Sequence, residues 1–227
     1  MGSIIIQNET TENPIWLMGK EAGVCWGADT VDYQKQYDRG VKCLKSNHGR
    51  LMEFPQVYFV ANGYSARVIR ELYTHIGGGP TRLQASTRYI DYENDGFKYV
   101  IPDSLDAKQA MIYHKAMHDI MSSLKELTSM GVAREDVALL LPLGMKTKCV
   151  VRTNLRNLVD MSRQRLCTRA YWEFRELMVD LMESLSAYSP EWKTCVENLF
   201  KSKCEVQGYC TESRGCGKFP QQDVEWK

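Results

Sequence analysis

The segment His75-Ile-Gly-Gly-Gly-Pro-Thr-Arg-Leu-Gln-Ala-Ser-Thr-Arg-Tyr89 places three consecutive glycines between a helical pattern and a run of alternating polar residues. Glycine adopts positive φ values without strain and lets the backbone approach a ligand closely. Successive N–H groups in such a loop can form an anion-binding nest. Because the C-terminus of the preceding helix repels phosphate, an anion would have to be bound by the loop's own N–H groups and by nearby arginines.

The polar side chains after the loop are Arg82, Gln84, Ser86 and Arg88, at alternate positions. Alternate side chains share one face when a segment is extended. We therefore expect two guanidinium groups, a carboxamide and a hydroxyl on one side, a set that suits a nucleotide monophosphate. The alternative interpretation is a glycine helix cap followed by a polar edge strand.

Size and charge restrict the class of protein. The chain has 227 residues, which indicates one domain or a tightly joined pair. Its 29 basic and 28 acidic residues nearly balance, so a nucleic-acid polymer is not an expected partner, and any anion site should be local. We find no apolar run long enough for a membrane span and no signal peptide. Eight cysteines without such a signal indicate a reducing compartment, so we expect a cytoplasmic protein with mostly free thiols.

Hydrophobic periodicity predicts an α/β fold in which a central mixed or antiparallel sheet is flanked by long helices. The expected strands are 3–7, 56–61, 86–92 and 146–153. The expected helices are 29–46, 65–74, 134–141, 154–166 and 190–201, together with a long helix that begins at Ser104 or Asp106 and ends at Met130 and one that begins at Cys167 or Thr168 and ends at Tyr188. Asp29, Ser65 and Asn154 are the predicted caps of their helices, and Asn62 and Gly63 are predicted to form a turn. Residues 15–27 mix apolar side chains with glycines and are assigned no element.

The motifs resemble those of flavin-dependent thymidylate synthases. That family carries Arg-His-Arg, a spacer of seven residues, and a Ser followed closely by Arg-Tyr. Here His75 stands at the central His, and Ser86, Arg88 and Tyr89 match the end of the motif. Further family positions follow in order: Leu141-Pro142, Thr147, Asn154-Leu155-Arg156, Arg165 and Ala170-Tyr171-Trp172-Glu173. The resemblance covers roughly residues 48–173.

Several positions depart from the family pattern. Thr74 and Ile76 replace the two arginines that flank the family His, and the spacer has nine residues. Ala138 stands where the family usually has an arginine that helps to bind substrate phosphate, and Arg169 stands at a later family His. Arg82 and the inserted glycines are the expected replacements for the lost loop arginines.

The resemblance implies an enzyme, a homotetramer with active sites between subunits, that methylates dUMP to dTMP. Its cofactor would be FAD, with methylenetetrahydrofolate and NADPH as co-substrates, and reduced flavin rather than a protein nucleophile would perform the difficult chemistry. One alternative is a related pyrimidine nucleotide C5 hydroxymethylase or methylase, and another is a non-catalytic flavin- or nucleotide-binding module. The synthase-like domain is expected to cover 1–203, followed by a Cys/Gly-rich tail at 204–227.

The resemblance also implies roles for individual residues. Arg165 would be the catalytic residue, because a guanidinium near a uracil carbonyl can stabilise developing negative charge. The nucleotide would be bound by Arg82, Gln84, Ser86, Thr87, Arg88 and Arg165. The flavin would be bound by Arg50, His75, Gly77, Gly78, Asn154, Arg156 and Asp160. The alternatives are weak surface ion pairs for the arginines, a strand hydroxyl for Ser86 and a helix cap for Asn154.

Cysteine and histidine residues raise the question of metal binding. Cys195, Cys204, Cys210 and Cys216 could hold a structural zinc, although their spacings of eight, five and five residues differ from the paired two-residue spacing of strong zinc motifs. Free thiols or a redox role are the alternatives. His114 and His118 have i,i+4 spacing but are interpreted as surface histidines, and Cys25 and Cys149 are interpreted as structural.

Overall fold

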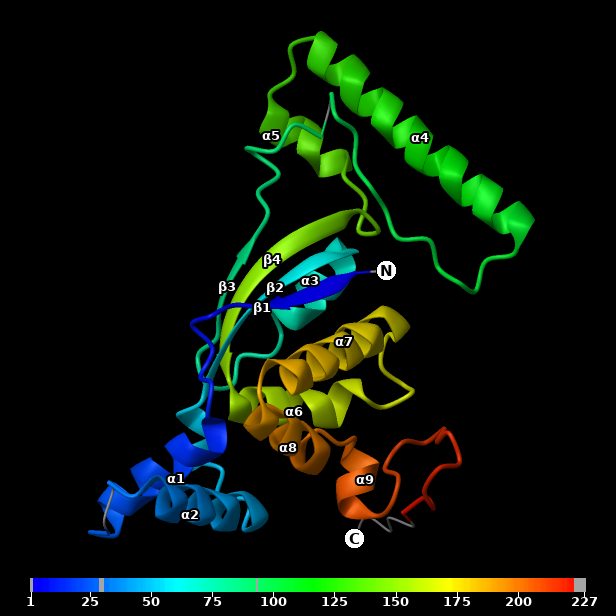
Figure 1. The fold of residues 1–227 in the computed structure, drawn as a ribbon. Coiled ribbons are helices and arrows are strands. Elements are labelled where there is room, and N and C mark those ends of the chain that lie inside the picture. The colour runs from blue at the N-terminus through cyan, green and yellow to red at the C-terminus, as the bar shows by residue number, and fades with distance from the viewer. Residues whose placement is uncertain (1, 29–30, 93, 223–227) are drawn as a thin grey trace, which may run out of the picture. The chain divides into compact units, whose positions relative to one another are not determined.

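The computed structural model describes residues 2–28, 31–92 and 94–222 and combines helices with one sheet (Figure 1). Within these residues the sheet has four strands in the order β1-β2-β4-β3 and is antiparallel. The strands are β1 (Ser3–Ile6), β2 (Gln56–Ser65), β3 (Thr81–Gln84) and β4 (Lys146–Asn154). The α/β class and an antiparallel sheet are therefore confirmed.

The described residues form nine α-helices and two short 3-10 turns. They are α1 (Pro14–Cys25), α2 (Tyr33–Lys45), α3 (Ala66–Leu72), α4 (Ala107–Ser129), α5 (Arg134–Val137), α6 (Leu155–Arg165), α7 (Trp172–Tyr188), α8 (Pro190–Leu199) and α9 (Lys203–Gln207), with 3-10 turns η1 (Leu51–Glu53) and η2 (Ala138–Leu140). Two predicted caps are confirmed. The backbone N–H of Val68 donates to Ser65 Oγ at 3.2 Å, and that of Asn157 donates to Asn154 Oδ1 at 2.9 Å.

The chain forms two compact units, and β2 and β4 contribute residues to both. Unit 1 consists mainly of Ala61–Thr74 and Arg82–Val150. Its core includes Met117 and Leu124, which lie on one face of α4 because they are seven positions apart. These side chains pack in one cluster with Phe97, Val137 and Met145.

Unit 2 consists of the described residues of Ile4–Val60, His75–Thr81 and Val151–Lys227. Helix α7 buries an apolar stripe with helical spacing, formed by Phe174, Leu177, Met178, Leu181 and Leu185. Helix α8 buries Trp192, whose Nε1–H donates to the carbonyl of Thr11 at 2.6 Å. The buried carboxylate of Glu191 accepts from the backbone N–H groups of Ile15 and Trp16, which are otherwise unpaired donors at the start of α1.

The sequence pattern does not predict helix α1, whose segment contains several glycines, and glycine lowers helix propensity. In the structure α1 and α2 lie side by side (Figure 1). A Cβ on Gly19 would be 1.8 Å from the carbonyl oxygen of Gln36, and a Cβ on Gly40 would be 1.9 Å from that of Ile15. The glycines thus permit direct backbone contact between the two helices, and this contact stabilises a helix that local propensity disfavours.

Two predictions, one for residues before the glycine loop in the sequence and one for residues after it, are wrong. Strand β2 continues through Asn62 and Gly63 to Ser65, so the predicted turn is absent; Gly63 adopts φ +80 within the strand. The predicted strand 86–92 is a turn, in which Ser86 Oγ accepts from the N–H of Arg88 at 3.1 Å and the carbonyl of Ser86 accepts from the N–H of Ile90 at 3.3 Å. The serine hydroxyl thus gives the backbone N–H of Arg88 a hydrogen-bond acceptor in place of a neighbouring strand.

Other boundaries also differ from the prediction. The predicted cap Asp29 lies outside the described residues, and α2 begins at Tyr33 with Asp32 as its cap. The predicted helix 134–141 divides into α5 and η2, α7 begins at Trp172 rather than at Cys167 or Thr168, and α9 was not predicted. Each difference falls at a short element or an element end, where few residues carry the periodic signal.

Candidate functional site

The glycine loop lies in unit 2 and packs against the junction between β4 and α6. Gly78 and Gly79 adopt φ values of +72 and +61. A Cβ on Gly78 would be 2.2 Å from Asn154 Nδ2, and one on Gly77 would be 3.2 Å from Asn157 Oδ1. Arg152 on β4 donates from Nη2 to the carbonyl of Gly79 at 3.3 Å. The loop is therefore held closely against two amide side chains, and position 78 has no room for a side chain.

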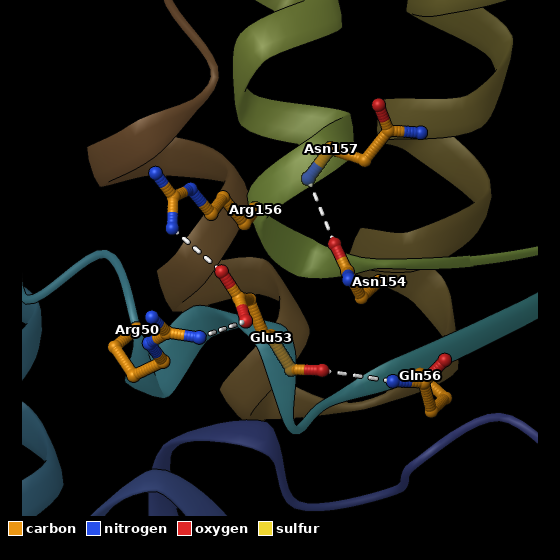
Figure 2. A network of polar contacts seen from close by, with 6 residues as sticks. All are labelled: Arg50, Glu53, Gln56, Asn154, Arg156 and Asn157. Carbon is orange, nitrogen blue, oxygen red and sulfur yellow. Dashed lines mark hydrogen bonds and ion pairs between the residues drawn. The ribbon is translucent and has the colours of Figure 1, made fainter. Parts of the chain in front are cut away.

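Those amides are themselves fixed. Asn154 and Asn157 are buried, and Asn154 Oδ1 accepts from the backbone N–H of Asn157 (Figure 2). Asn157 Nδ2 donates to Thr153 Oγ1 at 2.7 Å. Asn154 therefore caps α6 as predicted and also contacts the glycine loop. One side chain thus stabilises the start of the helix and packs against the loop.

His75 and Arg165 are brought together although they are 90 positions apart in the sequence. Arg165 Nε donates to His75 Nε2 at 2.9 Å, and the guanidinium carbon lies 4.5 Å from the centre of the Phe174 ring. Because arginine only donates, Nε2 of the buried His75 must accept, which assigns a neutral imidazole with its proton on Nδ1. Arg165 is thus a cation with a fixed position at the C-terminal end of α6, where the helix dipole favours positive charge.

Arg50 and Arg156 share one carboxylate in unit 2 (Figure 2). Arg156 Nη1 lies 2.6 Å from Glu53 Oε1, and Arg50 Nη1 lies 3.5 Å from Glu53 Oε2. The backbone carbonyl of Glu53 accepts from Gln56 Nε2 at 2.9 Å. Both arginines are exposed and each guanidinium has five N–H donors, so the pair can bind an anion while it stays paired with Glu53.

Asp160, another residue predicted to bind flavin, lies beside the C-terminal segment. Its carboxylate pairs with Arg163 at 3.2 Å on the exposed side of α6. It lines a hollow of about 690 Å³ together with residues of α9 and the tail, including Cys204 and Cys210. The structure thus groups Asp160 with the C-terminal segment of unit 2.

The predicted nucleotide-binding residues between 82 and 88 lie in unit 1 and do not form one polar face, because β3 ends at Gln84. Arg82 Nη1 donates to the carbonyl of Leu72, and its guanidinium lies over the Tyr73 ring. Gln84 Nε2 donates to Thr147 Oγ1 at 3.5 Å.

The last three of these residues lie in the turn after β3. Ser86 and Thr87 are half-buried there. Arg88 Nε pairs with Glu135 Oε2 at 3.1 Å, and both side chains of this pair are exposed. The expectation of a shared extended face is therefore wrong.

Three lysines that line a hollow in unit 1 are not among the residues predicted from the sequence. Lys98, Lys146 and Lys148 surround a volume of about 440 Å³, whose wall also includes Ala85 and Ile90. Lys146 and Lys148 lie on the less buried side of β4, while Thr147 and Cys149 between and after them are buried. The alternation Lys-Thr-Lys was visible in the sequence and could have indicated a cationic strand face.

The predicted zinc site is wrong for the part of the chain that the structure describes. No group of three or more Cys, His, Asp or Glu side chains among these residues is arranged to hold a metal ion. Cys195 lies fully buried in α8, where burial raises the pKa of its thiol. Among the described residues it does not join the hollow that Cys204, Cys210 and Cys216 line.

The other candidate nucleophiles and ligands differ in burial. Burial raises the pKa of Cys149 to about 11, so it is a thiol at neutral pH and a poor nucleophile. Cys25 is an exposed residue of α1. His118 is exposed, as the interpretation of a surface histidine requires, whereas His114 is half-buried and its Nδ1 is hydrogen-bonded to the Tyr99 hydroxyl at 2.6 Å.

Comparison with known proteins identifies similar sequences. The family model described as thymidylate synthase complementing protein matches residues 9–191. A flavin-dependent thymidylate synthase from Geobacter sulfurreducens is 30% identical over 151 residues, which cover 66% of this chain and 64% of the relative. The enzyme of that name from Pyrococcus furiosus is 31% identical over 175 residues, 75% of this chain and 71% of the relative. The one from Clostridium tetani is 28% identical over 247 residues, 96% of this chain and 94% of the relative.

A similar fold is found among solved structures. The crystal structure of thymidylate synthase X from Helicobacter pylori with FAD and dUMP superposes with a TM-score of 0.68. The match covers 87% of this chain and 100% of the Helicobacter chain, at 17% sequence identity, so it supports the fold. No described helix of this chain has the length and apolar character needed to cross a membrane.

Proposed function

Because this chain belongs to the family of thymidylate synthase complementing proteins, the flavin-dependent thymidylate synthases, we propose that it is an enzyme that converts dUMP to dTMP. FAD is the proposed cofactor, and methylenetetrahydrofolate and NADPH are the proposed co-substrates. The single observation that carries the proposal is the junction of the glycine loop with Asn154, Asn157 and the His75–Arg165 pair, since these residues occupy or adjoin family motif positions.

The chain's own groups fit a flavin in unit 2. Gly78 and Gly79 adopt positive φ values, and the backbone N–H groups of such a glycine loop can form an anion-binding nest. Arg50 and Arg156 offer exposed guanidinium donors that suit a pyrophosphate. FAD, when bound, supplies the hydride chemistry that amino-acid side chains cannot perform.

Arg165 is the proposed catalytic residue. A guanidinium donates hydrogen bonds and carries a fixed positive charge, so this residue would act as a charge and not as an acid. The hydrogen bond to His75 and the Phe174 ring hold it in one orientation. A charge that is oriented before the reaction stabilises negative charge developing on a uracil carbonyl at low reorganisation cost.

For the nucleotide, we propose that the phosphate lies among Lys98, Lys146 and Lys148 in unit 1. Two loop arginines of the family are replaced by Thr74 and Ile76, and Arg82 is engaged with the Leu72 carbonyl and the Tyr73 ring. The lysines therefore offer the positive charge that the altered motif lacks. Gln84, Ser86, Thr87 and Arg88, in and after β3, remain proposed nucleotide contacts.

We further propose a cytoplasmic homotetramer. All eight cysteines are free thiols in the structure, which agrees with a reducing compartment. Several large apolar side chains of unit 1 are exposed, among them Met111 and Ile112 on α4 and Leu139 after it. Exposed apolar groups of this size suit burial against further subunits.

The first test is the visible absorbance of the freshly purified protein, with the released chromophore identified after heat denaturation. Bound or readily added FAD, followed by dTMP formation from dUMP with NADPH and methylenetetrahydrofolate, would support the proposal. A protein that neither contains nor takes up FAD would contradict it. Product analysis with dUMP and dCMP separates methylation from hydroxymethylation and from another nucleotide preference.

The phosphate assignment has its own test in dUMP titrations. Lys148→Ala should weaken binding by about tenfold, because a charge-assisted hydrogen bond contributes about 1.5 kcal/mol or more. Lys125→Ala, which removes an exposed lysine of α4, is the matched control and should leave the affinity unchanged. Equal affinity of the Lys148 variant and the unmodified protein would remove the lysines from the nucleotide site.

A further inference from the structure

Four cysteines line one hollow near the C-terminal end of unit 2. Cys167, Cys204, Cys210 and Cys216 surround a volume of about 300 Å³, and three of them lie beyond residue 191, where the family match ends. Among the described residues they do not form a metal-binding group. The hollow therefore needs an explanation that the proposed synthase activity does not provide.

Cys210 and Cys216 belong to one short closed loop. The N–H of Cys210 donates to the carbonyl of Pro220 at 2.7 Å, and the N–H of Gln222 donates to the carbonyl of Cys210 at 2.9 Å. Cys210 Sγ lies 3.2 Å from the position of a Cβ on Gly215, the chain neighbour of Cys216. The backbone thus holds the Cys210 sulfur next to the residue that precedes Cys216.

The two thiols differ in accessibility. Cys216 is exposed, while Cys210 is half-buried at the base of the loop. The backbone N–H of Lys218 and the Thr168 hydroxyl hydrogen-bond the Cys216 sulfur and lower its pKa, which raises the fraction of reactive thiolate. A positively charged group is also near, since Lys218 lines the same hollow, where it is bound to Glu205 at 2.7 Å.

We propose that Cys216 and Cys210 form a thiol–disulfide exchange site for small disulfides of the glutathione type. Cys216 loses its proton to solvent and its thiolate attacks one sulfur of the small disulfide. The S–S bond breaks, a mixed disulfide forms at Cys216, and the departing thiolate takes up a proton. Cys210 then loses its proton and attacks the Cys216 sulfur, which releases the second small thiol. Two protein thiols are oxidised to one disulfide, and one small disulfide is reduced to two thiols.

The remaining cysteines are less suited to the entry step. Cys43, Cys149 and Cys195 are buried, so a small disulfide cannot reach them. Cys204, whose Sγ lies 3.3 Å from the Ser202 hydroxyl, and Cys167 are half-buried. Cys25 is exposed but lies in α1, outside the residues that line the hollow, and therefore serves as a matched control for exposure.

The test treats the reduced full-length protein with oxidised glutathione without oxygen and maps the products by mass spectrometry after alkylation of free thiols. We expect an intramolecular Cys210–Cys216 disulfide. Cys210→Ser should stop at glutathione attached to Cys216, and Cys216→Ser should abolish both products at this site. Glutathione should attach to Cys216 severalfold faster than to Cys25.

Two results would overturn the proposal: equal modification rates at Cys25 and Cys216, or a Cys210→Ser variant that still forms a disulfide at Cys216 with another cysteine of the chain. Cys204→Ser is the second control, because it removes another thiol of the same hollow and should leave the Cys210–Cys216 product unchanged. Circular dichroism of each variant establishes that it is folded. Since the readout is the disulfide map, it does not depend on synthase activity.

Discussion

The glycine loop of unit 2 and the polar segment that follows it in unit 1 are adjacent in sequence but differ in their surroundings. In unit 2, Gly78 lies against the Asn154 amide, and His75 is hydrogen-bonded to Arg165. In unit 1, Arg88 forms an exposed ion pair with Glu135, and Ser86 lies in a turn. The segment in unit 1 keeps Ser86, Arg88 and Tyr89 of the family motif and the segment in unit 2 keeps only His75, yet it is His75 that is buried and fixed by a partner.

A residue can therefore match a family motif without being held in place by buried contacts. A buried polar group must find its partners within the protein, so a substitution there affects both folding and function. An exposed charge keeps water as an alternative partner, so its loss affects mainly ligand binding. Substitutions in the two regions should therefore separate stability effects from activity effects.

The largest effect is expected for Arg165→Ala. We expect the turnover of dUMP to fall by about 10²–10³-fold, because one oriented donor to a developing negative charge contributes about 2.7–4 kcal/mol. Steady-state dTMP formation measures it, and Arg165→Lys, which keeps the charge but loses the planar fork, should be intermediate. An unchanged turnover in Arg165→Ala would remove this residue from the reaction.

Gly78→Ala should reduce the free energy of unfolding by about 3 kcal/mol. Positive φ costs about 1–2 kcal/mol for a residue with a Cβ, and overpacking against Asn154 Nδ2 adds about 1–3 kcal/mol. Gly79→Ala is the matched control, because it shares the positive φ but its Cβ would meet open space. Chemical denaturation compares the two, and equal losses would show that the close contact with Asn154 is unimportant.

Asn154→Ala should cost about 1 kcal/mol of unfolding free energy, with an upper bound of about 2 kcal/mol, since it removes the cap of α6. Asn154→Ser keeps a hydroxyl acceptor for the same N–H and should recover most of the loss. The measurement is again chemical denaturation. If both variants lost the same stability, the contact with the loop rather than the cap would be the main contribution of this side chain.

The smallest stability effect is expected for Arg88→Ala, within about 0.5 kcal/mol, because its ion pair with Glu135 is exposed. Glu135→Ala breaks the same pair and is the control. If Arg88 binds nucleotide, only Arg88→Ala should weaken dUMP binding, as measured by titration. A loss of stability above about 1 kcal/mol in either variant would mean that this region is as constrained as the glycine loop.

Local patterns in the sequence predicted much of the regular structure. The caps Ser65 and Asn154, the strand 146–153 and the long helix after Asp106 follow from hydrogen bonds and periodicity within a few residues. The prediction of a strand at 86–92 failed because the Ser86 hydroxyl accepts a hydrogen bond from the backbone N–H of Arg88, and this bond competes with strand pairing.

The sequence pointed to individual candidate residues but not to their arrangement in space. The family motif pointed to His75, Asn154 and Arg165, and the structure brings the loop to Asn154 and His75 to Arg165. It did not show that Arg82 is engaged with the Leu72 carbonyl, or that Lys98 joins Lys146 and Lys148 around one hollow. Such groupings depend on which distant segments become neighbours, and single-sequence periodicity carries no information on that.

The sequence by itself determined the family, the helix caps Ser65 and Asn154 and the alternation of strand β4, because these depend on residue types at fixed short spacings. The tertiary structure alone decided that the glycine-containing segment 15–27 forms α1, since Gly19 and Gly40 permit backbone contact with α2. It also decided that His75 is neutral and accepts from Arg165 across 90 positions of sequence. Both outcomes arise from contacts between segments far apart in the chain, which burial stabilises and local propensity does not encode.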